Sequence, residues 1–420
     1  MATPAQRTNT WTLDQWYDQA VAGTTGGYSG AGQLYTLGRN AHGQLGQNVQ
    51  TPGAPGYRSS PTQVPGNFKV VSYGDYGVVH SIKGDNTLWA WGDNEYGQLG
   101  LNDAGTGGPG PEYSSPTQVP GSWSTVCSGA YNGQVLAVQT NGTLWAWGYA
   151  GRGQDGLNGT KGNGAPQGAQ GPRLSSPTQV GTDTTWSASG TADKLYMNYY
   201  VQAIKTDGTL WAWGQNSTGL LGLNAVNPTG LSSPTQVGAD TDWAKVTTGG
   251  VNAFAFATKT DGSLWVSGYN NYGQLGQNSP TNSHRSSPVQ IPGTWSRAGG
   301  LDDAAIGLKA DGTLWGWGRV VAGNLGMNEG GNPGLSLSSP VQIGTNTNWE
   351  SIQVGWESTW ARKTDGSIWA WGANDSGAKG YINNDSKISS PTQLPGTDWA
   401  SFNQTAGRTQ SSQSALLREV

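Results

Sequence analysis

Few side chains in this 420-residue chain could do chemistry, and their spacing matches no catalytic or metal-binding pattern. The three histidines, His42, His80 and His284, are far apart and follow unrelated motifs. Catalytic triads and zinc sites need several such groups in one place. The single cysteine, Cys127, excludes an internal disulfide framework and zinc sites made of several cysteines. We therefore predict no catalytic residues, no metal site and no cofactor.

Two further patterns bear on an enzymatic role. Hydrolysis of a glycan needs two carboxyl groups at a fixed separation. Acidic residues recur near the start of successive predicted inner strands, at Asp193, Asp302, Asp303 and Glu357. The segment 105–110 has the glycine spacing of a dinucleotide-binding loop, but a proline follows it and no helix starts there. Because nothing fixes the carboxyl separation, a glycan hydrolase is the third hypothesis, and we expect a protein that is not an enzyme.

The composition predicts a polar surface with little charge. Charged residues make up 11% of the chain, against about 25% in ordinary soluble domains. The net charge is −4, the isoelectric point is near 5.4, and the lysines and arginines are scattered. Such a chain has no basic field to displace counterions from a phosphate backbone. Nucleic acid is therefore not an expected partner.

The elements that must position these residues belong to a repeat. A short apolar word, typified by Leu-Trp-Ala-Trp-Gly, is followed by a Gly-Gln-Leu-Gly turn and then by a Ser-Ser-Pro phrase. The glycine that closes the word recurs at Gly38, Gly92, Gly148, Gly214, Gly268, Gly318 and Gly372. The steps of 54, 56, 66, 54, 50 and 54 residues indicate a repeat architecture, so most of the unusual residues belong to the scaffold.

Each repeat predicts a set of antiparallel strands. The pair Asp207-Gly208, like its counterparts, predicts a type I′ turn between two strands. In the strand at 210–213 the side chains alternate, so both tryptophans lie on one face and the leucine and alanine on the other. This pattern fits sheets that stack face to face. Because proline cannot donate to a sheet ladder, the Ser-Ser-Pro phrase is predicted to be the outermost strand.

The two ends of the chain predict how the array closes. After the last Ser-Ser-Pro phrase the chain continues through Trp399 to an apolar strand at 415–417. The first apolar word, at 32–38, has no strand before it. Joined, the N- and C-terminal strands share one blade and leave no open sheet face. We predict an all-β fold over residues 30–420, a seven-bladed β-propeller of four-stranded antiparallel blades.

Residues 1–29 stand outside the repeat and form a predicted N-terminal helical extension. Thr12 and Gln15 make a capping box, and Gly23 can end the short helix. The apolar stripe of this helix consists of Leu13, Trp16, Tyr17, Ala20 and Val21. In one interpretation the helix folds back onto the ring. In the other, favoured by the glycines that follow it, the helix is an anchor that docks on another protein.

Two features of the repeat region are candidate binding surfaces. The segments between the Gly-Gln-Leu-Gly turn and the Ser-Ser-Pro phrase vary freely, over 47–58, 101–113, 157–174, 223–231, 277–285, 327–337 and 381–388. Variable loops on a rigid ring are common binding sites, although neutral drift explains them equally well. An insertion brings together Tyr196, Tyr199 and Tyr200, which either form an interface or cover a neighbouring blade.

The apolar word at 88–92, followed by Asn-Glu-Tyr-Gly-Gln-Leu-Gly at 94–100, resembles the regulator of chromosome condensation repeat. The resemblance covers about nine-tenths of the chain and implies a seven-bladed propeller. The family includes a nucleotide exchange factor for a small GTPase and a plant photoreceptor. Segment 355–359 approaches the photoreceptor motif once, with Glu357 where that motif has arginine.

These features predict a structural or adhesive protein, namely a bacteriophage virion component such as a tail fibre, tail tip or capsid decoration. The chain has no apolar run long enough to span a membrane and no secretory signal, which predicts synthesis in a host cytoplasm and a place in the virion. Its expected partners are other virion proteins, bound through the N-terminal segment, and a host-surface receptor or glycan, bound through the loops. The alternative is a regulatory protein-binding propeller that acts on a partner such as a GTPase.

Overall fold

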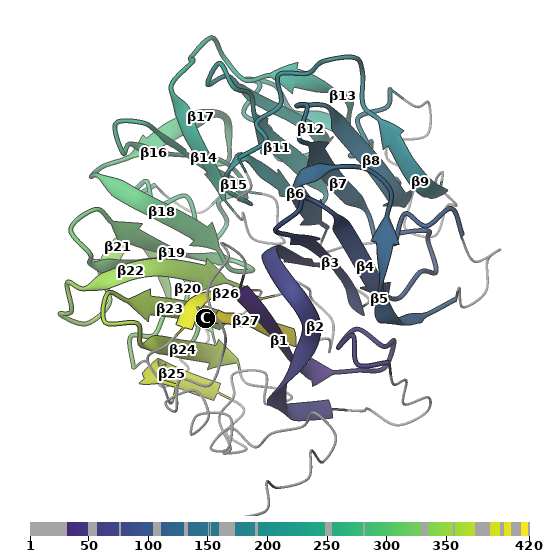
Figure 1. Ribbon diagram of the computed structural model, residues 1–420. Coiled ribbons are helices and arrows are strands. Elements are labelled where there is room, and N and C mark those ends of the chain that lie inside the picture. Colours follow the sequence, from purple (N-terminus) through teal and green to yellow (C-terminus); the bar gives the residue numbers. More distant parts are fainter. Residues whose placement is uncertain are drawn as a thin grey trace, which may run out of the picture.

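The strands form a ring of antiparallel sheets around a central axis (Figure 1). This computed structural model describes residues 32–48, 57–74, 77–103, 111–129, 133–149, 151, 153–158, 173–189, 192–247, 254–279, 282–321, 323–328, 335–355, 358–373, 387–394, 399–404 and 413–418. The predicted extension at 1–29, with its helix, lies outside the described residues. Within them the helical element is one short 3₁₀ turn, η2 (Ala192–Lys194).

The described residues form six sheets, one of seven strands and five of four. The seven-stranded sheet contains, in spatial order, β26 (Trp399–Gln404), β27 (Gln413–Arg418), β1 (Gly32–Arg39), β2 (Tyr57–Tyr73), β3 (Val78–Lys83), β4 (Leu88–Gly92) and β5 (Tyr113–Val119). The next sheet contains β6 (Trp123–Ser128), β7 (Val135–Gln139), β8 (Leu144–Tyr149) and β9 (Arg173–Gln179). The third contains β10 (Leu195–Met197), β11 (Tyr200–Ile204), β12 (Leu210–Asn216) and β13 (Asn227–Gln236).

The remaining three sheets repeat the same antiparallel order. The fourth contains β14 (Trp243–Thr247), β15 (Phe254–Lys259), β16 (Leu264–Gly268) and β17 (Arg285–Ile291). The fifth contains β18 (Trp295–Gly300), β19 (Ala304–Lys309), β20 (Leu314–Arg319) and β21 (Ser336–Gln342). The sixth contains β22 (Trp349–Val354), β23 (Ser358–Lys363), β24 (Ile368–Ala373) and β25 (Lys387–Gln393). The last strand of each carries the Ser-Ser-Pro phrase, as predicted.

The prediction of seven separate four-stranded blades is wrong, because the strands form six sheets. Strand β2 runs without a break, pairing with β1 through its first part and with β3 through its second. Phe68 is the shared residue, opposite both Gly32 and Lys83. Unlike β4, which starts at the leucine of the apolar word, β1 starts two residues earlier. Its extra residues continue the ladder across the Pro65-Gly66 link and fuse what would be two blades.

The predicted union of the chain ends is confirmed. Strand β1 pairs antiparallel with β27, with Leu34 opposite Leu417. The innermost strands then surround the axis and contact one another in the cyclic order β2, β6, β10, β14, β18, β22, β26 and back to β2. Pairing of the ends removes the open sheet face that a linear array would leave.

The apolar core lies between neighbouring sheets, as the alternation predicted. Leu88 and Ala90 of one sheet are buried in one cluster with Trp123 and Trp147 of the next. The indoles of Trp123 and Trp147 meet edge to face, with ring centroids 5.6 Å apart. The same arrangement recurs between the following sheets. The tryptophans of these clusters are therefore scaffold, since they join neighbouring sheets and dominate the buried area there.

The Asp-Gly turns differ from the predicted type I′ geometry, as the hairpin at Lys205–Thr209 shows. The Gly208 amide donates to the Lys205 carbonyl, the Lys205 amide donates to the Thr209 carbonyl, and only Gly208 of the pair has a positive φ, 80°. This is a type I turn followed by a glycine bulge. Asp207 keeps a negative φ because its carboxylate accepts from the Thr209 amide at 3.0 Å. A Cβ on Gly208 would lie 1.9 Å from the Thr241 carbonyl oxygen, so glycine is required.

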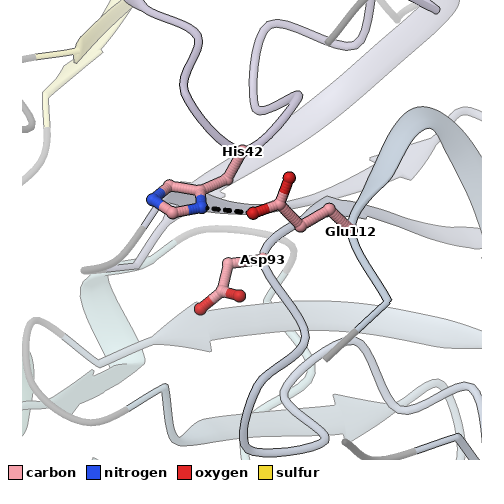
Figure 2. Close-up of side chains that lie close together, drawn as sticks. All are labelled: His42, Asp93 and Glu112. Atoms are coloured by element: carbon pink, nitrogen blue, oxygen red, sulfur yellow. Dashed lines mark hydrogen bonds and ion pairs between the residues drawn. The ribbon is translucent and has the colours of Figure 1, made fainter. Parts of the chain in front are cut away.

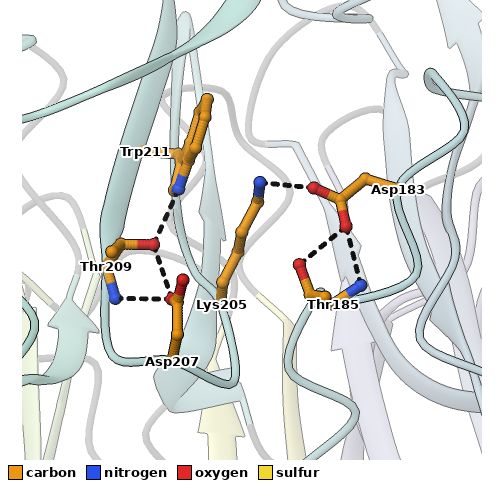
Figure 3. A network of polar contacts seen from close by, with 6 residues as sticks. All are labelled: Asp183, Thr185, Lys205, Asp207, Thr209 and Trp211. Atoms are coloured by element: carbon orange, nitrogen blue, oxygen red, sulfur yellow. Dashed lines mark hydrogen bonds and ion pairs between the residues drawn. The ribbon is translucent and has the colours of Figure 1, made fainter.

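A polar relay continues from this turn to the core (Figure 3). The Thr209 hydroxyl donates to Asp207 at 2.7 Å and accepts from the Trp211 indole N–H at 2.9 Å. The Lys205 ammonium lies 3.7 Å from the Trp211 ring centroid and forms an ion pair with Asp183. Equivalent lysines cover indoles at 3.7–5.1 Å in other sheets, at Lys83, Lys259, Lys309 and Lys363. Several of the chain's few cations are thus structural.

Each Gly-Gln-Leu-Gly turn is tied to the outermost strand of the following repeat. The Asn48 amide donates to the Ser114 carbonyl, and the Asn102 amide donates to the Ser175 carbonyl, both at 2.8 Å. Gly43 lies against this strand so closely that a Cβ would fall 2.6 Å from the Ser114 Cα. These contacts bring the residues that precede each Ser-Ser-Pro strand next to the turn of the repeat before it. We call such a contact a repeat junction.

Candidate functional site

The first repeat junction brings together an imidazole and two carboxylates (Figure 2). His42 lies in the turn after β1, Asp93 directly follows β4, and Glu112 directly precedes β5. The His42 Nδ1 and Glu112 Oε1 atoms are 2.7 Å apart. One potential ligand atom from each of the three residues lies within 4.8 Å of the other two. These are the side-chain types that bind divalent cations.

The three side chains differ in exposure. The side chains of His42 and Glu112 are 33% and 27% exposed, whereas Asp93 is 5% exposed. A solvent ion can therefore reach the pair, while the buried carboxylate forms the floor of the group. This combination of a fixed inner ligand and mobile outer ligands permits binding without opening the core.

Asp93 is held in place by its own loop. Its Oδ1 accepts from the Glu95 amide at 3.2 Å, and its Oδ2 accepts from the Gln98 side-chain amide at 2.9 Å. Burial raises the pKa of Asp93, and the nearby charge of His42 partly opposes this rise. A carboxylate in this position gains from a neighbouring positive charge because its own hydration is lost.

This group was not predicted from the sequence, for which we expected no metal site. His42 occupies a turn position that holds Tyr96 and Tyr272 in other repeats, so it looked like a structural substitution. Glu112 lies in the variable segment 101–113. The signal that could have revealed the group is the repeat itself. In every repeat the turn position held by His42 should lie next to the residue two places before the Ser-Ser of the following repeat, here Glu112. The turn contacts of the repeat make those positions neighbours.

The second repeat junction uses the same three positions for a different purpose. Tyr96, Tyr149 and Arg173 replace His42, Asp93 and Glu112. The Arg173 guanidinium carbon lies 4.8 Å from the Tyr96 ring centroid, and Arg173 also donates to the Glu95 carbonyl at 3.3 Å. The rings of Tyr96 and Tyr149 meet edge to face at 5.6 Å. This junction is a packed aromatic and cationic contact without clustered acids.

A separate group of charges lies on the axial side of the ring. The innermost strand of the β10–β13 sheet is interrupted, since Trp186 pairs with Lys205 as an isolated bridge and β10 begins at Leu195. Between them, η2 lies against β6, β10, β11 and β14. Arg297 of β18 donates to Asp193 of η2 at 3.0 Å. The Asp193–Arg297 pair therefore links η2 to the β18 sheet. The insertion that carries η2 and the long segment 157–174 together produce the 66-residue step in the repeat.

Three basic side chains gather around this insertion, and we call them, with Asp193, the axial cluster. They are Lys194, Lys245 and Arg297. Burial lowers the pKa of Lys194, Asp193 raises it, and the charge of Lys245 lowers it again. Lys245 also donates to the Ser296 carbonyl at 3.4 Å. The cluster carries three positive charges and one negative charge within a chain whose net charge is −4.

The tyrosines predicted to form a loop surface are mostly internal. Tyr196 and Tyr200 are 8% and 2% exposed, and Tyr199 is half-buried. The Tyr200 hydroxyl donates to the Phe254 carbonyl at 3.0 Å. Burial of Tyr196 and Tyr200 agrees with the second interpretation of these tyrosines, that they cover a neighbouring blade. The candidate anchor residues Leu13, Trp16, Tyr17 and Val21 lie outside the described residues.

Two of the acidic residues considered for glycan hydrolysis form ion pairs with different arginines. Asp193 pairs with Arg297, and Asp303, which is 8% exposed, pairs with Arg319 at 3.3 Å. Glu357 lies outside the described residues. No helix formed by the described residues is both long and apolar enough to cross a membrane.

Comparison with known sequences identifies the repeat. The regulator of chromosome condensation (RCC1) repeat matches residues 31–80, 85–133, 207–255 and 261–298. The chain is 28% identical over 270 residues to the human probable E3 ubiquitin-protein ligase HERC6, covering 60% of this chain and 23% of that protein. It is 26% identical over 204 residues to human E3 ubiquitin-protein ligase HERC2, covering 46% and 4% respectively. The chain thus spans a minor part of these curated relatives.

Solved structures with the same fold cover nearly the whole chain. Human WBSCR16 superposes with a TM-score of 0.71 at 19% identity, covering 93% of this chain and 99% of that one. Prp20p from Saccharomyces cerevisiae superposes with a TM-score of 0.70 at 16% identity, covering 94% and 93%. The protein is therefore a repeat β-propeller. Four of its segments match the regulator of chromosome condensation repeat.

Proposed function

We propose that this chain is a regulatory protein-binding propeller that docks a partner protein on the axial cluster. The observation that supports this proposal is the insertion at 187–194. It departs from the regular innermost strand, and it collects Lys194, Lys245 and Arg297 on the axial side. A closed ring needs no such insertion for its own packing.

The charge of the cluster suggests the chemistry of the partner. Three cations and one anion attract an acidic segment, and the surrounding polar surface adds little competing charge. Partial burial of these side chains strengthens the attraction, because fewer water molecules screen it. We therefore expect an acidic protein surface to bind here, with an association rate that falls as salt is added.

Related propellers support a protein-binding role over a virion role. Prp20p has binding properties to Gsp1p and histones, and the yeast protein has also been crystallised bound to Kap60. The region shared with this chain makes up only a small part of the ubiquitin-ligase relatives. The regulatory hypothesis, set second on the sequence alone, is for these reasons placed first, with an exchange factor-like activity as its specific form.

The test measures binding of the full chain to purified Gsp1p by biolayer interferometry, with purified histones as a basic control whose binding the cluster should not favour. A second assay follows release of labelled GDP from a small GTPase. We expect saturable binding that the double variant Lys245→Glu/Arg297→Glu weakens at least tenfold. The matched control is Arg285→Glu/Lys387→Glu, which makes the same charge change at exposed positions of outermost strands. Absence of binding to Gsp1p, or equal loss in both variants, would refute the proposal.

The virion hypothesis retains one independent support, the apolar stripe of the predicted N-terminal helix. If residues 1–29 are an anchor, their removal leaves a folded ring that no longer joins its assembly. Circular dichroism and co-sedimentation with the assembly measure these two properties. Normal incorporation of the truncated chain would exclude the anchor and with it this hypothesis.

A further inference from the structure

We propose that His42, Asp93 and Glu112 bind a divalent transition-metal ion of the zinc class, which clasps the turn after β1 to the β4–β5 connection. The proposal is independent of partner binding, because these residues belong to a different part of the ring from the axial cluster. It rests on the geometry of three side chains that are far apart in the sequence and that meet at the first repeat junction.

The distances suit a small cation. Metal–nitrogen and metal–oxygen bonds near 2.1 Å place adjacent ligand atoms about 3.0–3.5 Å apart. The three candidate atoms lie within 4.8 Å of one another, and His42 and Glu112 are already in contact. Half-exposed His42 and Glu112 can make the small rotations that are needed. Asp93 need not move, because the Gln98 amide and the Glu95 backbone hold its carboxylate.

The ligand types select the metal. One imidazole and two carboxylates suit zinc, cobalt, nickel or manganese, whereas calcium and magnesium prefer all-oxygen sites. Three protein ligands leave at least one position for water. Among first-row ions available to proteins, zinc is favoured by affinity over manganese. We therefore expect zinc to bind more tightly than manganese, and calcium to bind weakly.

Charge also favours an ion at this junction. Two carboxylates face one histidine, and one of the carboxylates has lost most of its hydration. A divalent cation neutralises both acids at once.

The position of the clasp gives it a consequence for the ring. The His42 turn follows β1, and β1 pairs with β27 to close the ring. An ion that joins this turn to the β4–β5 connection restrains the strand that closes the ring. Local opening of β1 should then become rarer, since opening must break metal bonds as well as the ladder.

The experiment titrates the full-length, metal-free chain with Zn²⁺ in an isothermal calorimeter. Co²⁺ binding followed by visible absorption gives a second readout of the ligand geometry. We expect one site, weakened at least ~10-fold by His42→Ala and by Glu112→Gln. The matched control is His284→Ala, because His284 is exposed and stacks on Tyr269 away from this group. Hydrogen exchange of the β1 amides should slow when Zn²⁺ is added to the wild type.

Two results would overturn the proposal. One is Zn²⁺ binding that is unchanged in both His42→Ala and Glu112→Gln while thermal unfolding shows that the variants are folded. The other is a loss of binding in His284→Ala equal to that in His42→Ala. The proposed partner binding is measured with Lys245 and Arg297 variants in metal-free buffer, so either proposal can fail while the other stands.

Discussion

The first and second repeat junctions have the same backbone and opposite chemistry. In both, a backbone carbonyl of the Gly-Gln-Leu-Gly turn accepts a hydrogen bond from the indole N–H of a tryptophan in the next repeat. Trp91 donates to the Gln44 carbonyl at 2.9 Å, and Trp147 donates to the Gln98 carbonyl at 2.8 Å. The first junction adds His42 and two carboxylates. The second adds Arg173 stacked on Tyr96. The scaffold therefore fixes three neighbouring positions and leaves their side chains free to vary.

This difference separates structural from functional residues more reliably than residue type does. The 21 tryptophans are the most unusual feature of the composition, yet those of the repeat are shared by successive sheets and form the core. His42 and Glu112 are ordinary residues at positions that the second repeat junction fills with Tyr96 and Arg173. We expect a function specific to this chain at positions where the side chain differs from one repeat to the next, because residues that all repeats share are explained by the fold.

The largest expected effect tests whether the two junctions share one scaffold. Trp91 and Trp147 are 0% and 1% exposed. Replacing either with alanine should destabilise the protein by about 3–5 kcal/mol, through lost burial and a cavity. Urea unfolding measures both values, with half-buried Trp145→Ala as a milder control. A difference of several kcal/mol between the two buried sites would show that the junctions are not equivalent.

A smaller effect should distinguish the junctions by pH, because the second one also contacts His80. The His80 Nε2 lies 3.0 Å from the Gln98 carbonyl and must donate, so Nδ1 accepts from the Ser128 hydroxyl at 2.9 Å. Burial lowers the pKa of His80 from 6.5 to about 3, although the bond to Gln98 raises it slightly. Between these values the unfolded chain binds more protons, so stability falls as pH drops below 6.5.

For His80 this proton linkage lowers the free energy of unfolding by about 2 kcal/mol between pH 7 and pH 5. The variant His80→Gln removes the titrating group, so its stability should vary less over that interval. Urea unfolding at both pH values gives the comparison. If wild type and variant lose the same stability on acidification, His80 is not the group responsible. The control is His42→Gln, which removes the histidine of the first junction and leaves His80 in place.

The smallest effect concerns the side chains that differ between the junctions. Arg173→Ala should cost about 1 kcal/mol, through the lost contact with the Tyr96 ring. In metal-free protein, Glu112→Gln should cost about 0.5 kcal/mol or less, as for other part-exposed ion pairs. Unfolding at low and high salt measures both. A Glu112→Gln loss larger than that of Arg173→Ala would mean that the acidic junction is a structural contact like its neighbour.

Local sequence patterns predicted the strands, the Ser-Ser-Pro edges and the pairing of the chain ends. They also predicted how the tryptophans pack, because alternation in a strand is a property of the backbone. They failed on the Asp-Gly turn, since the Asp207 carboxylate binds a backbone amide and keeps its own φ negative. They left Tyr196 and Tyr200 open between an interface and cover for a neighbouring blade, because an insertion can turn inward only when the neighbouring sheet offers space.

The repeat period and the alternation of side chains are properties of short stretches of sequence, so they were enough to predict an all-β repeat ring. The strands at the two ends of the chain predicted how the ring closes. The tertiary structure decided that the repeats form six sheets, because two extra residues of β1 carry one ladder across the Pro65-Gly66 link. It also decided which side chains meet at the junctions. His42 and Glu112 are 70 residues apart, and contact between them depends on the stacking of neighbouring repeats.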